Sequence, residues 1–359
     1  MFLSTFPGRH FPLWTVVMLL ILGSSTSEIQ TQSIVPSSDG TGTIVTPEND
    51  RFDISGGSLS ENGQNLFHSF EQFGLSSAQV ANFLANPNIQ NILSRVMGGD
   101  VSVIDGLLQV TGGTPNLYLM NPAGIIFGNG ARLDIPGSFT ATTATGIEFN
   151  QGVFSAFHEN NYQLLIGDPS SLIFAIVQPG SIVNAGVLTV SDLENLTLAA
   201  GQVLNLGTLG GGGVSITALP GTSTLRLTPN GRVLSLDLSI PDASLMENFT
   251  PSKLPDLLLG TALEQATNLD IRADGSVWLV APENSPESSP ENSDISPTIA
   301  ASDVEIVSTG TISGNGLISS DRLNLTAQQL GDQTNPLALD VNHLTTDTSS
   351  TGGNQFLAN

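Results

Sequence analysis

Cysteine is absent from the 359-residue chain, and lysine occurs once, as Lys253. Without cysteine the chain has neither disulfide bonds nor thiolate metal ligands. Basic residues are scarce, with 9 Lys and Arg against 32 Asp and Glu, which gives a formal net charge of −23. Binding to nucleic acid or to an anionic membrane surface requires basic patches. The composition therefore argues against both function classes, and the excess acid is typical of a surface that keeps a protein soluble.

Charged residues of either sign make up only 11% of the chain, whereas it contains 38 Gly and 20 Pro. The surface must therefore consist largely of Ser, Thr, Asn, Gln and Gly, which favours a turn-rich β protein over a helical one. The 39% hydrophobic content is enough for a substantial core in one large or two medium domains.

Residues 116–144 show the local pattern most clearly. Three short apolar runs, at 117–120, 125–127 and 133–135, are separated by segments of Asn, Pro and Gly. Apolar runs this short cannot form helices, and the turn residues between them predict short strands joined by tight turns.

The first residues predict export. Arg9 and His10 precede an apolar run at 11–23, and small residues follow at 24–27. This is the pattern of a secretory signal peptide, predicted here as residues 1–27 with cleavage between Ser27 and Glu28. The run is shorter than the ~20 residues that span a bilayer as a helix, so a retained membrane anchor is the weaker alternative. The general secretion machinery is then the first expected partner.

Two segments before residue 100 are compatible with either a helix or a strand. Residues 76–85 place apolar side chains at helical spacing, but an Asn-Pro-Asn sequence stops the pattern, and residues 89–96 are equally ambiguous. The alternation at 65–70 predicts a strand with Leu66, His68 and Phe70 on one face and Phe67 on the other, His68 being partly covered. Asp105-Gly106 predicts a turn between two strands.

Beyond residue 150 short strands recur with a rhythm of roughly 15–25 residues, as in a β-solenoid. This rhythm extends to residue 240, with Gly210–213 as a turn and 233–240 as a strand that alternates strictly after its first residue. The predicted organisation is a signal peptide at 1–27, a first β domain at 28–150, a solenoid continuation at 151–280 with an insertion near 241–260, a disordered acidic Pro/Ser linker at 281–298, and further coils at 299–359 that end as if truncated.

Short, evenly spaced strands are compatible with a sandwich or a barrel as well. Short Gly/Asn turns and small polar residues within the strands favour a parallel β-helix, in which each coil buries its apolar face against its neighbours. The predicted fold class is therefore all-β, a parallel β-helix (β-solenoid).

No constellation of residues predicts catalysis, a cofactor or a metal site. The four histidines are far apart in sequence, and no calcium-binding nonapeptide repeat is present. Polysaccharide-cleaving β-helix enzymes need clustered carboxylates. Here the acidic residues of the strand regions are scattered singly, at Asp134, Asp168, Asp192, Asp237 and Asp270.

A more specific signal comes from several motifs taken together. They are Asn86-Pro87-Asn88-Ile89, the segment 105–113 (DGLLQVTGG), Asn121-Pro122-Ala123-Gly124-Ile125 and the segment 133–141 (LDIPGSFTA). Over residues 34–144 this combination resembles the haemagglutination-activity domain of filamentous haemagglutinin-like exoproteins, which are secreted by two-partner secretion. The solenoid that follows is similar to that of longer, cyanobacterial-type members. The two Asn-Pro motifs depart from the usual form, because Ile89 replaces a Leu and Ala123 replaces an Asn.

The resemblance implies a right-handed parallel β-helix with an N-terminal cap, and it assigns the two-partner secretion domain to residues 28–150. It implies a secretion motif made of Asn86, Pro87, Asn88 and Ile89 together with Asn121, Pro122, Gly124 and Ile125. The motif residues either dock directly on the transporter or build turns that the fold requires. Pro fixes φ, Gly allows positive φ, and Asn bonds its own turn backbone, so the sequence is compatible with both interpretations.

The resemblance also implies a non-enzymatic exoprotein that passes through the periplasm to an outer-membrane β-barrel transporter with periplasmic binding modules. The expected location is extracellular or on the outer-membrane surface. The expected role is that of an adhesin with a carbohydrate or protein target on a host cell or matrix, and nucleic acid is not an expected partner. A polysaccharide-acting lyase or glycosidase and a purely structural surface component are the alternatives.

Overall fold

The computed structural model describes residues 34–219, 221–227, 233–237, 277–279, 297–348 and 352–358. The chain separates into two compact units, Met1–Thr31 and Gln32–Asn359, and all described residues belong to the second. The predicted signal peptide with its cleavage site, the insertion near 241–260 and nearly all of the predicted linker lie outside the described residues. Within the described ranges, no helix is long and apolar enough to cross a membrane.

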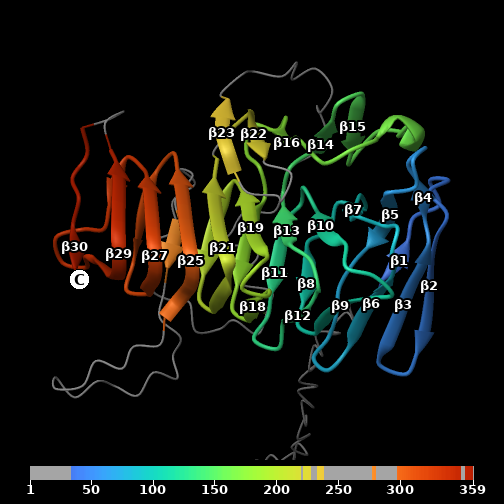
Figure 1. The fold of residues 1–359 in the computed structure, drawn as a ribbon, viewed down its shortest axis with the longest axis horizontal. Helices are drawn as coiled ribbons and strands as arrows, with labels where there is room; N and C mark the ends of the chain where they lie inside the picture. The colour runs from blue at the N-terminus through green and yellow to red at the C-terminus, as the bar shows by residue number, and fades with distance from the viewer. Residues whose placement is uncertain are drawn as a thin grey trace, which may run out of the picture. The chain divides into compact units, whose positions relative to one another are not determined.

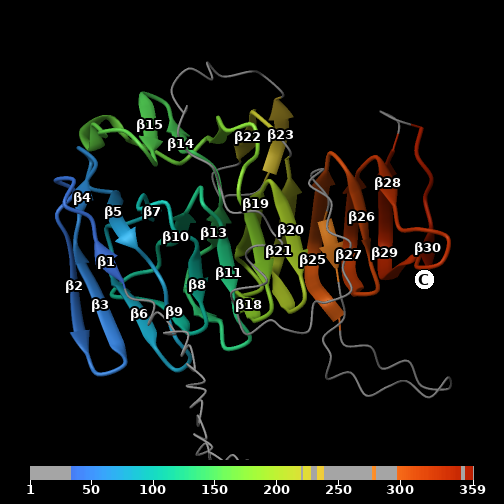
Figure 2. The ribbon, with the colours of Figure 1, turned by 180° about the vertical axis from the view of Figure 1, so that it is seen from behind.

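Parallel strands stack in three faces, which we number in the order in which each coil of the chain visits them (Figures 1 and 2). Leu117, for example, pairs with Ile92 of the preceding coil and with Phe139 of the following coil. Main-chain hydrogen bonds thus join successive coils instead of neighbouring strands of one coil. This is a parallel β-helix, and crossovers between parallel strands are right-handed. The predicted fold class is confirmed.

Short strands supply the first coils, and long strands that bend from face 1 to face 2 supply the later ones. Face 1 contains β3 (Arg51–Gly56), β6 (Val80–Leu84), β9 (Leu107–Thr111), β12 (Arg132–Asp134), β18 (Val187–Thr189) and β30 (Leu357–Ala358). Face 2 contains β5 (Asn65–Gln72), β7 (Asn91–Val96), β10 (Asn116–Met120), β13 (Phe139–Thr142) and β19 (Asn195–Ala200). The strands that run through both faces are β21 (Thr208–Ala218), β25 (Pro297–Ser308), β27 (Leu317–Thr326) and β29 (Leu337–Asp347).

Face 3 closes each coil with a short strand. Its members are β8 (Ser102–Ile104), β11 (Ile125–Phe127), β17 (Ser181–Asn184), β20 (Gln202–Asn205), β24 (Val277–Leu279), β26 (Thr311–Gly314) and β28 (Gln329–Leu330).

The first coils are capped by antiparallel strands. These are β1 (Val35–Pro36), β2 (Thr43–Glu48) and β4 (Ser58–Leu59), which pair with β5, β3 and β5 respectively. The cap leaves β3 paired on one edge with β2 and on the other with β6. An antiparallel hairpin therefore covers an edge that would otherwise be open to a further parallel strand. The implied N-terminal cap is confirmed.

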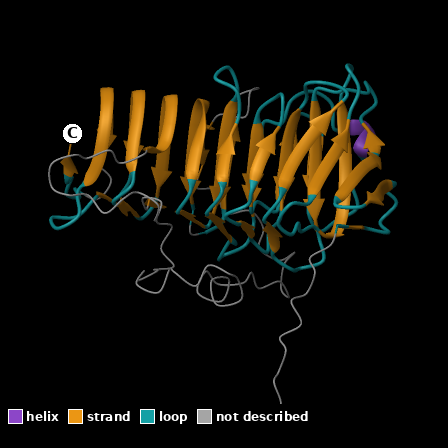
Figure 3. Cartoon of the chain, turned by 90° about the horizontal axis from the view of Figure 1, so that it is seen from below, coloured by secondary structure: helices purple, strands orange, loops and turns teal. Residues whose placement is uncertain are grey.

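A second sheet lies outside the coils, over face 2. It is antiparallel and contains β14 (Gly146–Phe149), β15 (Gly152–Ser155), β16 (Ser171–Phe174), β22 (Ser223–Leu227) and β23 (Val233–Asp237). We call it the outer sheet. The short 3₁₀ helix η1 (Tyr162–Leu164) lies between β15 and β16, and it is the helix drawn in Figure 3. Everywhere else the described chain consists of strands and loops (Figure 3).

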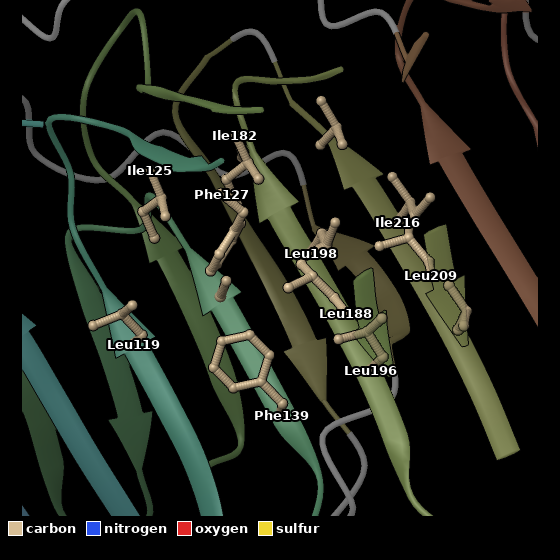
Figure 4. Packing of buried hydrophobic residues seen from close by; sticks show 14 of the residues in the cluster. Leu119, Ile125, Phe127, Phe139, Ile182, Leu188, Leu196, Leu198, Leu209 and Ile216 are labelled. Atoms are coloured by element: carbon tan, nitrogen blue, oxygen red, sulfur yellow. The ribbon is translucent and has the colours of Figure 1, made fainter. Parts of the chain in front are cut away.

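Two hydrophobic cores follow from the alternation of side chains. Leu117 and Leu119 of β10 join an inner core that runs from the cap to β29. Figure 4 shows the middle of this core, where Leu119, Phe127 and Phe139 lie close together. Tyr118 and Met120 of β10 point outward and pack under the outer sheet. A strand with buried residues on both faces has no solvated side, and β7 and β13 are accordingly buried along their whole length, their polar residues included.

Most predicted strands are confirmed, and both ambiguous segments form strands, β6 and β7. Three expectations were wrong. Residues 225–227 and 233–237 belong to the antiparallel outer sheet, so the solenoid rhythm does not extend through residue 240. Gly210–213 lies within β21, where the chain bends from face 1 to face 2, and does not separate two strands. His68 is fully buried instead of partly covered.

Candidate functional site

The first Asn-Pro motif forms an exposed turn between β6 and β7. The Ile89 main-chain N–H donates to the Asn86 carbonyl oxygen at 3.0 Å, and the Asn88 N–H donates to Asn86 Oδ1 at 2.9 Å. Proline at the second position fixes the φ angle that such a turn needs, and the asparagine side chain closes it from outside. Asn86, Pro87 and Asn88 are exposed, whereas the Ile89 side chain is buried in the inner core.

The following coil supports this turn from one side. A Cβ atom at Gly113 would lie 2.6 Å from the Asn86 carbonyl oxygen, so only glycine permits the observed approach. Leu84, at the end of β6, is 38% exposed beside the motif. The backbone thus holds the turn in one shape, while the side chains of Asn86, Pro87 and Asn88 are exposed to solvent.

The second motif forms the corner between β10 and β11 and is buried. Asn121 Nδ2 donates to the Asp100 carbonyl oxygen and to Ser102 Oγ, both at 2.9 Å, and Asn121 Oδ1 accepts from the Ala123 N–H at 2.9 Å. The Gly124 N–H closes the turn on the Asn121 carbonyl oxygen at 3.1 Å. Asn121 is 1% exposed. Its side-chain nitrogen and its side-chain oxygen are both used in hydrogen bonds that hold the corner.

Packing by the next coil explains this burial. Gly180, just before β17, lies so close that a Cβ atom there would come within 2.5 Å of the Pro122 carbonyl oxygen. Gly124 has φ of 132°, a backbone conformation that side chains disfavour. Ile125 is fully buried and pairs with Ser102 on one side and Ile182 on the other. A partner protein has no access to this corner in the folded domain.

The structure does not bring the two motifs together. Asn86–Ile89 lies between faces 1 and 2 of one coil, and Asn121–Ile125 lies between faces 2 and 3 of the next coil. Ala123, which stands where the usual motif has an asparagine, is 1% exposed. A partner protein therefore has no access to this substituted position either. A single recognition surface containing all eight predicted residues is therefore absent from the folded domain.

Sequence reasoning missed the most connected polar residue of this region, Arg95. Its side chain is 2% exposed and forms an ion pair with Asp39, Nη2 to Oδ2, at 2.6 Å. A single arginine within the otherwise apolar and small-residue strand Asn91–Val96 is the signal that could have pointed to it.

A row of three asparagines, Asn65 and Asn91 buried and Asn116 half-buried, forms a second polar feature that the sequence did not identify. Asn91 Nδ2 donates to Asn65 Oδ1 at 2.9 Å, and Asn116 Nδ2 donates to Asn91 Oδ1 at 3.0 Å. The three residues occupy equivalent positions of β5, β7 and β10, so their amides form a ladder along face 2. Such a ladder favours one register of successive coils, because a shift of one residue would separate the paired amides. The end members also bond other groups: Asn65 Nδ2 donates to the carbonyl oxygens of Leu165 and Gly167, and Asn116 Oδ1 accepts from the Ser138 N–H.

Two groups in this region have strongly shifted pKa values. Burial lowers the pKa of His68 to about 3. Partial burial by itself raises the pKa of Asp39, but hydrogen bonds from Ser69, Thr41 and Arg95 outweigh it and hold this pKa well below its usual range. Within the described ranges, no group of three or more His, Asp or Glu side chains is arranged to hold a metal ion.

Comparisons with known proteins place the chain in a family. The model of the TPS secretion domain matches residues 31–250, more than half of the chain. The crystal structure of the filamentous hemagglutinin secretion domain has a TM-score of 0.45 and 16% identity, covering 90% of this chain and 99% of that one. The HMW1 secretion domain from Haemophilus influenzae has a TM-score of 0.42 and 15% identity, covering 89% and 83%. A search of curated proteins finds no significant match. On the match over residues 31–250, the chain belongs to the family of TPS secretion domains.

Proposed function

We propose that the chain is a secreted exoprotein whose N-terminal domain is recognised by its own outer-membrane transporter, a β-barrel with periplasmic binding modules. The observation that carries this proposal is the match of the TPS secretion domain to residues 31–250. The predicted signal peptide at 1–27 would deliver the chain to the periplasm, where the transporter meets it.

We further propose different roles for the two Asn-Pro motifs. Asn86, Pro87 and Asn88 are exposed on a rigid turn and are available as a contact for the transporter. Asn121, Pro122, Gly124 and Ile125 are buried, and their role is to build the corner between faces 2 and 3. Loss of Asn121 would then reduce secretion through folding, whereas loss of Asn88 would reduce it through binding.

The fold suits a chain that is exported without an external energy source. Each coil offers a complete edge of parallel hydrogen bonds to the coil that follows, as between β19 and β21 and between β25 and β27. Coils that fold in sequence outside the membrane would bias the chain outward. The final location is extracellular or on the outer-membrane surface, and the role is that of an adhesin without enzymatic activity, in a member of the longer cyanobacterial type.

The test is secretion of the full chain by cells that also express its transporter, combined with binding of the purified chain to the transporter's periplasmic modules. Asn88→Ala is the decisive variant, because the Asn86 side chain and main chain close the turn without the Asn88 side chain. Asn129→Ala, at another exposed turn, is the matched control. Asn88→Ala should lower binding and secretion with an unchanged circular dichroism spectrum, and Asn129→Ala should change neither.

Asn121→Ala and Gly124→Val complete the experiment. Both should lower secretion in proportion to a loss of thermal stability, because their partners are groups of the fold itself. If Asn121→Ala folds as stably as the wild type yet no longer binds the modules, the assignment of that motif to folding is wrong. If no variant and no wild-type chain binds or is secreted, the proposed transporter partnership is wrong.

A further inference from the structure

Arg95 lies where three parts of the domain meet. It belongs to β7, pairs in the sheet with Ser69 and Met120, and points outward from the coil toward the outer sheet. Its side chain is 2% exposed. A buried guanidinium is tolerated only when its charge is paired and its N–H groups have acceptors.

The acceptors of Arg95 come from two segments that are far apart in sequence. On one side is the cap loop, residues 37–42 between β1 and β2, which supplies the Asp39 carboxylate. On the other side is the outer loop, which we define as residues 155–163, from the last residue of β15 into η1. It supplies the carbonyl oxygens of His158, at 2.8 Å, and of Ser155. Nη2 serves the first loop and Nη1 the second, so each loop satisfies a different nitrogen of the guanidinium.

The remaining contacts of the guanidinium come from rigid elements. Nε donates to Ser69 Oγ of β5 at 3.0 Å, and the guanidinium carbon lies 5.6 Å from the centre of the Phe154 ring of β15. The outer loop is itself fixed by Asn160, whose Oδ1 accepts from the Ser155 N–H at 2.7 Å. Arg95 is therefore held in place whichever loop is absent, but it is fully satisfied only when both are present.

A buried charge that loses one set of partners is strongly destabilising, so each loop raises the stability of the other through the group they share. We propose that Arg95 is a positioning residue that couples the cap to the outer loop, so that the cap and the outer sheet open and close as one unit. It follows that the cap of an emerging chain reaches full stability only after residues up to 158 have folded onto it. This inference concerns folding of the domain and stands independently of the transporter.

Other contacts also join the cap to the outer loop. The hydroxyl groups of Thr41 and Tyr162 lie 2.5 Å apart, and Gln163 Nε2 donates to the Leu59 carbonyl oxygen at 3.0 Å. Neither contact brings a charge. Thr41 is 1% exposed and its N–H also donates to Asp39 Oδ1, whereas the contact of Gln163 is exposed. An experiment must therefore separate coupling through Arg95 from coupling through the hydroxyl pair.

The experiment substitutes a residue in one loop and measures the rate of amide hydrogen exchange in the other loop of the full chain. Asp39→Asn removes the charge of the cap loop, and the amide read out is Ala156, which donates to the Thr145 carbonyl oxygen at 2.9 Å. Asn160→Ala loosens the outer loop, and the amide read out is Gly57, which donates to the Gly42 carbonyl oxygen at 2.9 Å. Each variant should speed exchange in the other segment by about tenfold, the size expected for one charge-assisted hydrogen bond.

Each change is then repeated in an Arg95→Lys chain, because lysine keeps a charge but cannot bond both loops at once. There the effect in the distant segment should disappear, whereas it should persist in a Tyr162→Phe chain, which loses the hydroxyl pair and keeps every partner of Asp39. Arg132→Lys, an exposed arginine of β12, is the matched control and should leave the effect intact. The proposal is wrong if Asp39→Asn and Asn160→Ala change exchange only in their own segments, or if the distant effect survives in the Arg95→Lys chain.

Discussion

His68 should make the stability of this domain fall as the pH drops below 6.5. Its imidazole is fully buried in the inner face of β5, with ring centroids 5.8 Å from Phe83 and 6.2 Å from Phe70. Neither ring nitrogen has a hydrogen-bond partner among the described residues. Protonation would therefore place an unpaired charge in an apolar core, which is why burial lowers the pKa from 6.5 to about 3.

The sign and size of the effect follow from this pKa difference. Below pH 6.5 the unfolded chain binds a proton that the folded domain does not accept until about pH 3. Stability is thus unaffected by His68 above pH 6.5 and falls as the pH drops from 6.5 toward 3. At pH 4.5, two units below the unfolded pKa, the loss is about 3 kcal/mol, at 1.36 kcal/mol per unit.

The assay is urea unfolding of the full chain, followed by circular dichroism between pH 7.5 and 4.5. Carboxylates also begin to titrate at the lower end, so the quantity to compare is the difference between the wild type and His68→Leu. Leucine has a similar volume and no titratable group, and it also removes two unsatisfied nitrogens. His343→Leu, on the exposed part of β29, is the matched control and should retain the wild-type pH dependence, because His68 is still present.

The free energy of unfolding of the wild type should fall by about 3 kcal/mol more than that of His68→Leu between pH 7.5 and 4.5. A constant difference across this range would refute the reasoning. It would mean that His68 becomes charged inside the folded domain without cost, and that the core around β5 opens to solvent.

Two further substitutions test how the coils are fixed to one another. Gly180→Ala should lower the melting temperature and the secreted amount, because its Cβ would lie 2.5 Å from the Pro122 carbonyl oxygen, whereas Gly221→Ala, with open space around it, should change neither. A melting temperature for Gly180→Ala equal to that of Gly221→Ala would show that the corner is looser than described. Asn91→Leu should cost about 2 kcal/mol in urea unfolding, because it removes the amide that bonds Asn65 and Asn116 and leaves the buried Asn65 Oδ1 without that partner. An unchanged unfolding midpoint would show that the ladder contributes nothing to register or stability.

Local sequence was sufficient for the elements whose structure depends on local chemistry. The runs at 117–120, 125–127 and 133–135 form β10, β11 and β12 with small shifts at their ends, because glycine, proline and asparagine between them admit only turns. The alternation of Leu66, Phe67 and His68 was also predictable, since successive side chains of a strand point to opposite faces. The inner core follows directly from this alternation.

Distant contacts decided the rest. The strictly alternating residues 233–237 are suited to a coil or to an antiparallel sheet alike, and only the pairing with β22 assigns them to the outer sheet. His68 is fully buried, where alternation alone predicts a strand-face residue that is partly covered. Arg95 is satisfied by Asp39 and His158, which the sequence places 56 and 63 residues away.

The two Asn-Pro motifs separate these contributions most clearly. Their sequences determine that both form tight turns, because proline restricts φ and asparagine caps its own turn, and each turn is present. Their surroundings differ: the segment at Gly180 covers Pro122, whereas nothing in the described chain covers Pro87. The sequence by itself determined the shape of each corner, and the tertiary structure alone decided which one a partner can reach, because exposure depends on the coil that packs next to it.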